Sequence, residues 1–165
     1  MTVCLAHQAT APVEQSGYGN EIEFTVYLIE ILYGPNATSR RVAGIQGQFW
    51  SPSTFATISV SDLLVVAEPS LYSREVGRVQ GLAVVASKDG SYNYQTSSFI
   101  FSEYNGSTLE TQGTFDRVSG EPSEIAVVGG TKQFRGARGI NILQLIVQAS
   151  YYRISQVTFR FSIPI

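Results

Sequence analysis

Histidine and cysteine are almost absent from this sequence of 165 residues, which contains one of each, His7 and Cys4. A single histidine leaves little room for histidine-based acid–base catalysis or for the common histidine and cysteine metal sites. A single cysteine has no partner within the chain, so no internal disulfide is expected. We therefore expect no bound metal, no cofactor and a domain that is stabilised by its core.

Charged residues are scarce as well, at 15% of the chain, compared with about 25% in typical soluble domains. The 11 basic and 13 acidic residues give a formal net charge of −2. Apart from the Arg40-Arg41 pair, the basic residues are scattered, so no basic stripe is available to neutralise phosphates. We therefore expect no nucleic-acid partner.

Long apolar runs are missing too. No stretch approaches the ~20 residues that a membrane helix requires, so we expect no membrane partner. The first residues do not show a basic segment followed by an apolar one, and no signal peptide is visible. Two alternatives follow: an intracellular chain, or a secreted chain whose signal has been removed.

Strand patterns, by contrast, are abundant, because period-2 alternation of Val, Ile, Phe, Tyr and Thr recurs along the chain. Turn residues separate the alternating segments at Gly34-Pro35-Asn36, Asp89-Gly90, Asn105-Gly106 and Gly129-Gly130. Many strands joined by short turns favour a closed antiparallel barrel, because a closed barrel has no edge strands. A barrel of eight strands is wide enough to hold a small ligand. The sequence predicts one all-β domain over residues 21–165, an eight-stranded antiparallel β-barrel, after a flexible N-terminal segment over 1–20. The expected strands are 22–32, 55–67, 76–87, 92–103, 107–115, 124–128, 136–148 and 151–163.

Glu30 is the most informative acidic residue, because it shares one face of the first strand with apolar residues from Ile22 to Leu32. A carboxylate on an inward face must be paired, hydrogen-bonded or kept partly neutral by a raised pKa. An acid with a raised pKa in a cavity is suited to general-acid chemistry. The alternatives are a bend of the strand near Glu30 or a salt bridge at the barrel end.

Asp62 and Arg138 are weaker candidates. Asp62 lies in an apolar alternation with Ile58 and Val66, and its simplest alternative is a cap at a strand end. Arg138 has small neighbours in Gly136-Ala137-Arg138-Gly139, which allow close packing around its guanidinium group. A strand-end or interface ion pair is its alternative.

Three ordered segments resemble the plant dirigent family. They are Val76-Gly77-Arg78-Val79-Gln80-Gly81, Glu103-Tyr104-Asn105-Gly106-Ser107-Thr108-Leu109, and Val127-Val128-Gly129-Gly130-Thr131 with Phe134-Arg135-Gly136-Ala137-Arg138-Gly139. A weaker match is Tyr27-Leu28-Ile29-Glu30-Ile31-Leu32, where the family commonly has a His-Asp-Ile-Leu strand. The resemblance extends over roughly residues 22 to 160.

The resemblance implies an eight-stranded barrel related to that of allene oxide cyclases, a homotrimer, and one pocket per barrel. It implies a small phenolic substrate and a function in stereoselective coupling during lignan or phenylpropanoid biosynthesis. A separate oxidase, a laccase or a peroxidase, supplies the phenoxy radicals, and the protein does no oxidation itself. An alternative within the family is an enzyme that cyclises or dehydrates a phenolic quinone methide.

The resemblance also implies roles for individual residues. Glu30 falls where lignan-forming members have a pocket Asp, and Glu124 matches an acidic residue before the Val-Val-Gly-Gly-Thr turn. Both are expected to hydrogen-bond phenolic oxygens or to protonate the quinone methide. Arg138 is expected to orient one of these acids or keep it ionised, and Tyr104 is expected to contact the substrate. Asp62 is a further candidate for substrate contact, from its place in the strand alternation and not from the resemblance. Ile29 departs from the family pattern, where His is usual.

The segments Phe55-Ala56-Thr57 and Val65-Val66 look closer to dirigent domains fused to jacalin-like lectins in grasses than to the lignan-forming group. That subgroup fits a role in plant defence and leaves open a non-catalytic carbohydrate-binding module. The paired cysteines of many secreted members are missing. By resemblance the protein is extracellular, in the apoplast, with the cytoplasm as the alternative.

Overall fold

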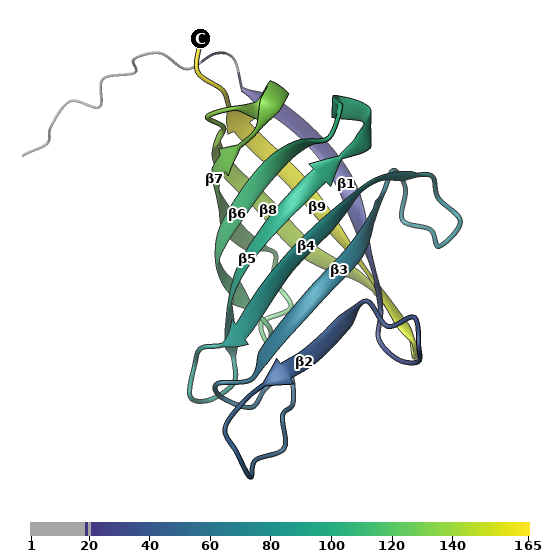
Figure 1. The fold of residues 1–165 in the computed structure, drawn as a ribbon, viewed down its shortest axis with the longest axis vertical. Coiled ribbons are helices and arrows are strands. Elements are labelled where there is room, and N and C mark those ends of the chain that lie inside the picture. The colour runs from purple at the N-terminus through teal and green to yellow at the C-terminus, as the bar shows by residue number, and fades with distance from the viewer. Residues whose placement is uncertain (1–18, 20) are drawn as a thin grey trace, which may run out of the picture.

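The computed structural model describes residue 19 and residues 21–165, which form nine strands and two short 3-10 helices (Figure 1). The elements are β1 (Ile22–Ile31), β2 (Ser39–Ala43), β3 (Ile58–Val66), β4 (Glu75–Val85), β5 (Tyr92–Phe101), η1 (Ser102–Tyr104), β6 (Ser107–Asp116), β7 (Ser123–Gly130), η2 (Lys132–Phe134), β8 (Arg138–Gln148) and β9 (Tyr152–Ser162). The expected flexible segment over 1–20 and the pair Cys4 and His7 lie outside the described residues. No helix in the described part of the chain is long and apolar enough to span a membrane.

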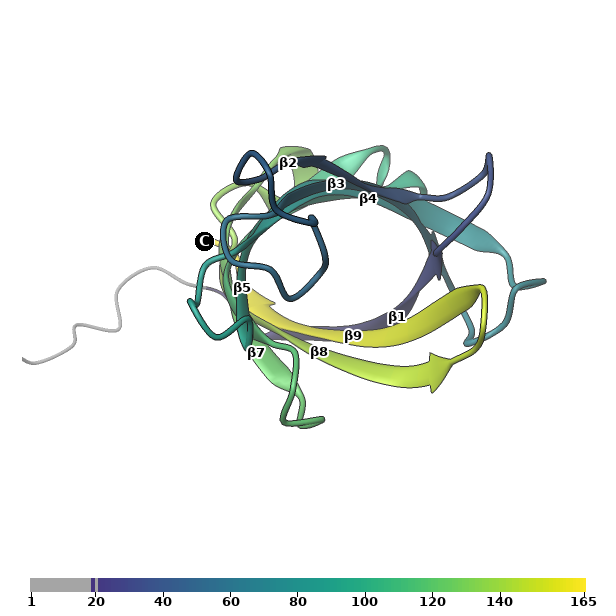
Figure 2. The same cartoon turned by 90° about the horizontal axis from the view of Figure 1, so that it is seen from below.

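All strands except β2 form a closed antiparallel barrel, so the predicted eight-stranded barrel is confirmed (Figures 1 and 2). The strand order is β1-β9-β8-β7-β6-β5-β4-β3-β2, and a further pairing between β1 and β3 closes the ring. Only three residue pairs make this closure, Tyr27 with Val66, Leu28 with Val65, and Ile29 with Leu64. The first residues of β3 pair instead with β2.

Strand β2 was not predicted, because Ser39-Arg40-Arg41-Val42-Ala43 has no apolar alternation. It exists because β1 leaves the β3 edge free from Ile58 to Ser61. An unpaired strand edge offers backbone donors and acceptors to any neighbouring segment.

The prediction of a hairpin turn at Gly129-Gly130 is wrong. Both glycines belong to β7, where they pair with Glu110 and Leu109 of β6, and the turn follows at η2. A Cβ atom on Gly130 would lie 2.3 Å from the carbonyl oxygen of Phe134. This position is therefore glycine because the chain returns close to it, and not because it forms the turn.

Aromatic rings fill the upper half of the barrel, at the end that carries η1, η2 and the C-terminus in Figure 1. Phe101 is central to them: its ring centroid lies 5.4 to 6.3 Å from those of five other rings. The cluster, which we call the aromatic plug, consists of Phe24, Phe99, Phe101, Tyr104, Phe134, Phe159 and Phe161. Edge-to-face and offset contacts of this kind stabilise a core beyond the area they bury.

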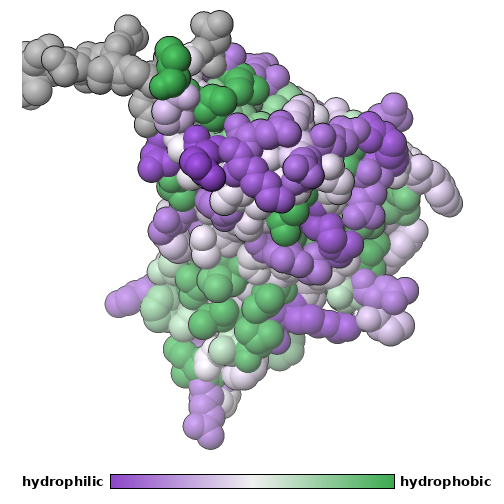
Figure 3. All heavy atoms as spheres, turned by 45° about the horizontal axis from the view of Figure 1, so that its top comes forward, coloured by the Kyte–Doolittle hydropathy of each residue, from purple (hydrophilic) through white to green (hydrophobic). Residues whose placement is uncertain are grey.

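On the side of the molecule that Figure 3 shows, apolar residues gather over the lower part and hydrophilic residues toward the upper end. Val60 of β3 and Leu82 of β4 are direct cross-strand partners on the outer face of the barrel and are 47% and 45% exposed. The alternation of β3 therefore places Ile58 and Val60 outside the barrel. Asp62 follows the same alternation and lies outside with them.

Candidate functional site

A cavity of about 560 Å³ occupies the lower half of the barrel, below the aromatic plug. Several of its inward residues are small or polar, such as Ser59, Ala83 and Ser97, whereas the rings of the aromatic plug fill the upper half. Its polar lining residues, apart from charged ones, are Ser39, Thr57, Ser59, Ser61, Asn93, Gln95, Ser97, Asn141 and Ser155. Its apolar lining includes Leu28, Leu63, Val79, Ala83, Val85, Phe99, Phe115, Leu143 and Val157. This volume is within the range of small-molecule sites.

Glu30 lies in this cavity, near the end of β1, where the alternation of the strand places it. Its side chain is 26% exposed, and Oε2 lies 3.7 Å from Nη1 of Arg153, its cross-strand neighbour on β9. Burial raises the pKa of the Glu30 carboxyl group above its usual value of 4.5. Arg153, the Ser39 hydroxyl group and Arg117 each lower this pKa, but together they do not outweigh the burial. Glu30 is therefore an acid that holds its proton to higher pH than an exposed glutamate does.

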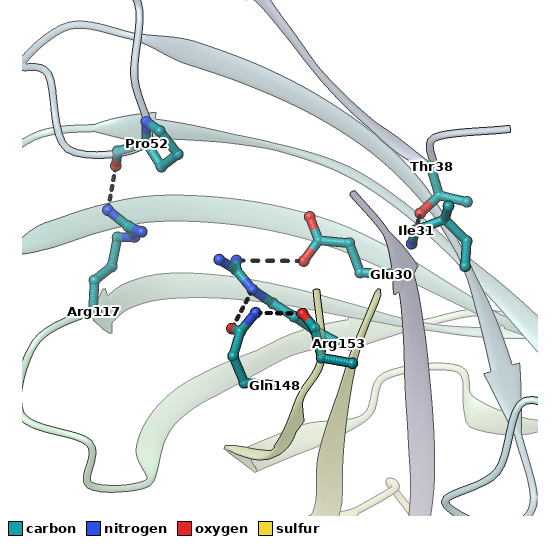
Figure 4. Close-up of polar contacts among 8 residues, drawn as sticks. Glu30, Ile31, Thr38, Pro52, Arg117, Gln148 and Arg153 are labelled. Atoms are coloured by element: carbon teal, nitrogen blue, oxygen red, sulfur yellow. Dashed lines mark hydrogen bonds and ion pairs between the residues drawn. The ribbon is translucent and has the colours of Figure 1, made fainter. Parts of the chain in front are cut away.

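Two guanidinium groups face the cavity with Glu30 (Figure 4). Arg153 also donates from Nε to Oε1 of Gln148, at 2.7 Å. Arg117 follows β6 and donates to the carbonyl oxygen of Pro52, in the loop between β2 and β3. Burial and the positive charge of Arg153 lower the pKa of Arg117, and Glu30 raises it. These two arginines are fixed by neighbouring side chains and backbone, so they present their charges to the cavity in a defined position.

Three buried side-chain oxygen atoms among the described residues have no hydrogen-bond partner, and all three belong to residues that line this cavity. They are Thr57 Oγ1, Asn93 Oδ1 and Asn141 Oδ1. Thr57 and Asn141 are only 1% and 2% exposed. A buried polar group without a partner is unfavourable, and a bound molecule or water satisfies it.

Glu124 does not share the cavity with Glu30. It lies on the outer face of β7 and is exposed, whereas its neighbours Ser123 and Ile125 are buried. The expectation that both acids meet one substrate is therefore corrected by the strand alternation. No group of three or more His, Cys, Asp or Glu residues that could bind a metal occurs in the described part of the chain.

The other three predicted residues also lie outside the cavity. Asp62 projects from the outer face of β3 and accepts a 2.8 Å hydrogen bond from Nε of Arg78, which lowers its pKa. Arg138 is exposed at the start of β8 and donates to the carbonyl oxygen of Ala137. Tyr104 belongs to the aromatic plug and lines a second, smaller pocket of about 190 Å³ at the upper end, with Arg74 and Glu103.

Arg117 and Arg153 were not predicted from the sequence, although each continues the inward alternation of a strand. The inward side chains of β9 occur at every second residue, from Arg153 through Ser155 and Val157 to Phe159. Arg117 lies two residues after the inward Phe115. Strand alternation, which predicted an inward position for Glu30, predicts inward positions for both arginines as well.

Comparison with known proteins places this barrel in a family. The sequence matches the Dirigent-like protein family over residues 21–162. The chain belongs to the dirigent family. Among dirigent relatives, it is 33% identical to dirigent protein 15 of Arabidopsis thaliana over 156 residues, which cover 84% of this chain and 81% of that protein. It is 35% identical to dirigent protein 11 of the same plant over 115 residues, 68% of this chain and 59% of that protein.

The chain is also similar to dirigent relatives that are named pterocarpan synthases. Pterocarpan synthase 1 of Glycyrrhiza echinata is 31% identical over 130 residues, 78% of this chain and 66% of that protein. The solved structure of a pterocarpan synthase dirigent protein superposes with a TM-score of 0.78 at 26% identity, covering 87% of this chain and 84% of the other. The closed barrel is thus the dirigent fold.

Proposed function

We propose that this dirigent protein binds a phenolic radical or quinone methide in the lower cavity and fixes the geometry in which the new bond forms. The observation that carries the proposal is Glu30, a half-buried acid with a raised pKa that faces a ligand-sized cavity. Family membership supports the phenolic class of substrate.

Glu30 supplies a proton where a quinone methide needs one. Transfer of the Glu30 proton to the quinone oxygen restores an aromatic phenol and leaves the exocyclic carbon open to attack by a hydroxyl group. The attacking hydroxyl loses its proton, which returns to the Glu30 carboxylate, so the protein is unchanged after the reaction. The walls of the cavity decide which face of the carbon is attacked. A difference of ~1.4 kcal/mol between the two faces already gives a tenfold preference.

The radicals come from a separate oxidase, a laccase or peroxidase, which removes one electron and one proton from each phenol. Binding in the cavity then orients the radicals before they couple. We propose further that the protein acts as a homotrimer in the apoplast. The exposed apolar outer face that includes Val60 and Leu82 supports self-association.

Coupling of coniferyl alcohol tests the proposal. The alcohol is incubated with an external one-electron oxidant, with and without the protein, and the coupled products are separated on a chiral column. We expect an enantiomeric excess that rises with protein concentration. Racemic products at every protein concentration would contradict the coupling function.

A second candidate is an enzyme that dehydrates and cyclises a phenolic benzylic alcohol without any oxidant. The similarity to pterocarpan synthases and the proton-holding Glu30 favour it. Glu30 would protonate the benzylic hydroxyl group, and water would leave as the phenolic proton returns to the Glu30 carboxylate, which forms the quinone methide. An internal hydroxyl group would then add to the exocyclic carbon, and its proton would pass to the quinone oxygen. Turnover of such an alcohol in the absence of oxidant distinguishes this activity from radical coupling.

A further inference from the structure

The charges that line the lower cavity are strongly unbalanced. Among the residues of 21–165 that line it, Glu30 is the only acidic one, whereas four are arginines, Arg40, Arg41, Arg117 and Arg153. Arg40 and Arg41 are exposed on β2, at the rim, whereas Arg117 and Arg153 are half-buried. The inner part of the cavity therefore holds two positive charges and at most one negative charge.

One carboxylate cannot balance both guanidinium groups. Glu30 is nearer to Arg153, at 3.7 Å, and its raised pKa means that it is less often charged than an exposed glutamate. Arg117 and Arg153 both line this cavity, and the pKa of Arg117 is lowered, first by burial and then by the positive charge of Arg153. Half-buried like charges are unfavourable without a counter-charge. Among the described residues that line the cavity, no second acid supplies it.

The unpartnered polar atoms point to the same conclusion about the ligand. Thr57 Oγ1, Asn93 Oδ1 and Asn141 Oδ1 are buried around the cavity without hydrogen bonds. A phenolic ring offers hydroxyl donors to such acceptors. The unpartnered oxygen atoms suit a ligand with hydroxyl groups, and the two inner arginines suit a ligand with a negative charge.

We propose that the phenolic ligand of the lower cavity carries a carboxylate, which binds to Arg117 and Arg153. Guanidinium groups bind carboxylates through paired, charge-assisted hydrogen bonds. The ligand is then an aromatic acid of the hydroxycinnamate class, and an uncharged phenolic alcohol binds less tightly. This inference rests on the proposed function, because it names the substrate class of the same site.

A matched pair of ligands tests the inference by isothermal titration calorimetry. Ferulate and coniferyl alcohol share the same ring and side-chain length and differ in the carboxylate. We expect ferulate to bind about 10-fold more tightly or better, the value of one hydrogen bond to a charged group. Added salt should weaken ferulate binding and leave the binding of the alcohol nearly unchanged. Equal affinities of the two ligands for the parent protein would overturn the inference, and this comparison requires no variant.

Substitutions at Arg117 test whether this residue binds the carboxylate of the ligand. Arg117→Gln should reduce the preference for ferulate about 10-fold and change the affinity for the alcohol by less than about twofold. Arg117→Lys should keep part of the preference, because the charge remains. Arg160→Gln is the matched control, since Arg160 lies on the outer face and pairs with Glu23. Equal weakening of both ligands by Arg117→Gln would show that Arg117 only shapes the cavity, and would overturn the inference.

The result also separates the two proposals. Stereoselective coupling of coniferyl alcohol without any preference for ferulate refutes the carboxylate site and leaves the proposed function standing. Absence of binding by both ligands, together with racemic coupling, refutes both.

Discussion

Glu30→Gln is the substitution that tests the proposed chemistry most directly, and its effect on stability follows from the structure. At 3.7 Å the attraction between Glu30 and Arg153 is about 4 kcal/mol at an effective dielectric constant of about 20. The pKa of Glu30 is raised nevertheless, because the effect of burial on the charged form outweighs those of Arg153, the Ser39 hydroxyl group and Arg117. Glutamine keeps the shape of the side chain without the charge. We therefore expect Glu30→Gln to be more stable than the parent protein at neutral pH, although an ion pair is lost.

The size of this stabilisation depends on pH in a defined way. The folded protein binds the Glu30 proton more tightly than the unfolded chain does, so Glu30 contributes its full stability below the unfolded pKa of 4.5. That contribution is lost as the pH rises through the folded-state pKa, by ~1.4 kcal/mol for each unit by which the pKa is raised. Urea unfolding of parent and variant should therefore agree below pH 4.5 and diverge above it, with the variant more stable.

The same substitution should remove the chemistry. Loss of a general acid typically lowers a rate about 10²- to 10⁴-fold, so we expect cyclisation or selective coupling by Glu30→Gln to fall by that factor. Glu30→Asp keeps the carboxyl group and should retain part of the activity. Glu124→Gln is the matched control on the outer face and should retain full activity. A Glu30→Gln protein that is less stable at neutral pH, or as active as the parent, would refute this reasoning.

Three further outcomes follow from the same structure. The rate of an oxidant-free cyclisation should fall as the pH rises through the raised pKa of Glu30, and a pH-rate profile from acid to alkaline pH measures it; a flat profile contradicts the acid role. Phe101→Ala should cost about 3–5 kcal/mol in urea unfolding, because it removes the central ring of the aromatic plug; Phe101→Leu should cost less. Ser97→Phe should fill the lower cavity and abolish ligand binding in calorimetry, whereas Thr96→Phe, on the outer face of the same strand, should not.

Strand alternation and turn chemistry predicted most of the barrel. The eight barrel strands lie within a few residues of the predicted ranges because each has its own inward apolar or small residues. Strand β2 was missed because it is held by the free edge of β3, a tertiary effect that leaves no periodic signal in residues 39–43.

Alternation located site residues only where the buried face was identified correctly. In β1 the apolar face is the inner one, so Glu30 was placed correctly. In β3 the outer face is also apolar, so the pattern around Asp62 pointed to the wrong side. The roles of Glu124 and Arg138 came from a motif match, and neither that match nor the small neighbours of Arg138 carry information about the direction of a side chain. The pairing of Arg153 with Glu30 depends on the β1–β9 register, which no local pattern in either strand specifies.

The barrel is divided into an aromatic plug and a lower half that contains the cavity, and this division determines which positions tolerate substitution. Inward residues of the plug, such as Phe101 and Phe159, hold the fold together, and substitutions there threaten it. Inward residues of the lower half, such as Ser59 and Ala83, line the cavity and contribute little to packing. New side chains can therefore be introduced at these lower positions at small cost to the free energy of unfolding. The lower half is the natural starting point for redirecting this barrel to other substrates by directed evolution.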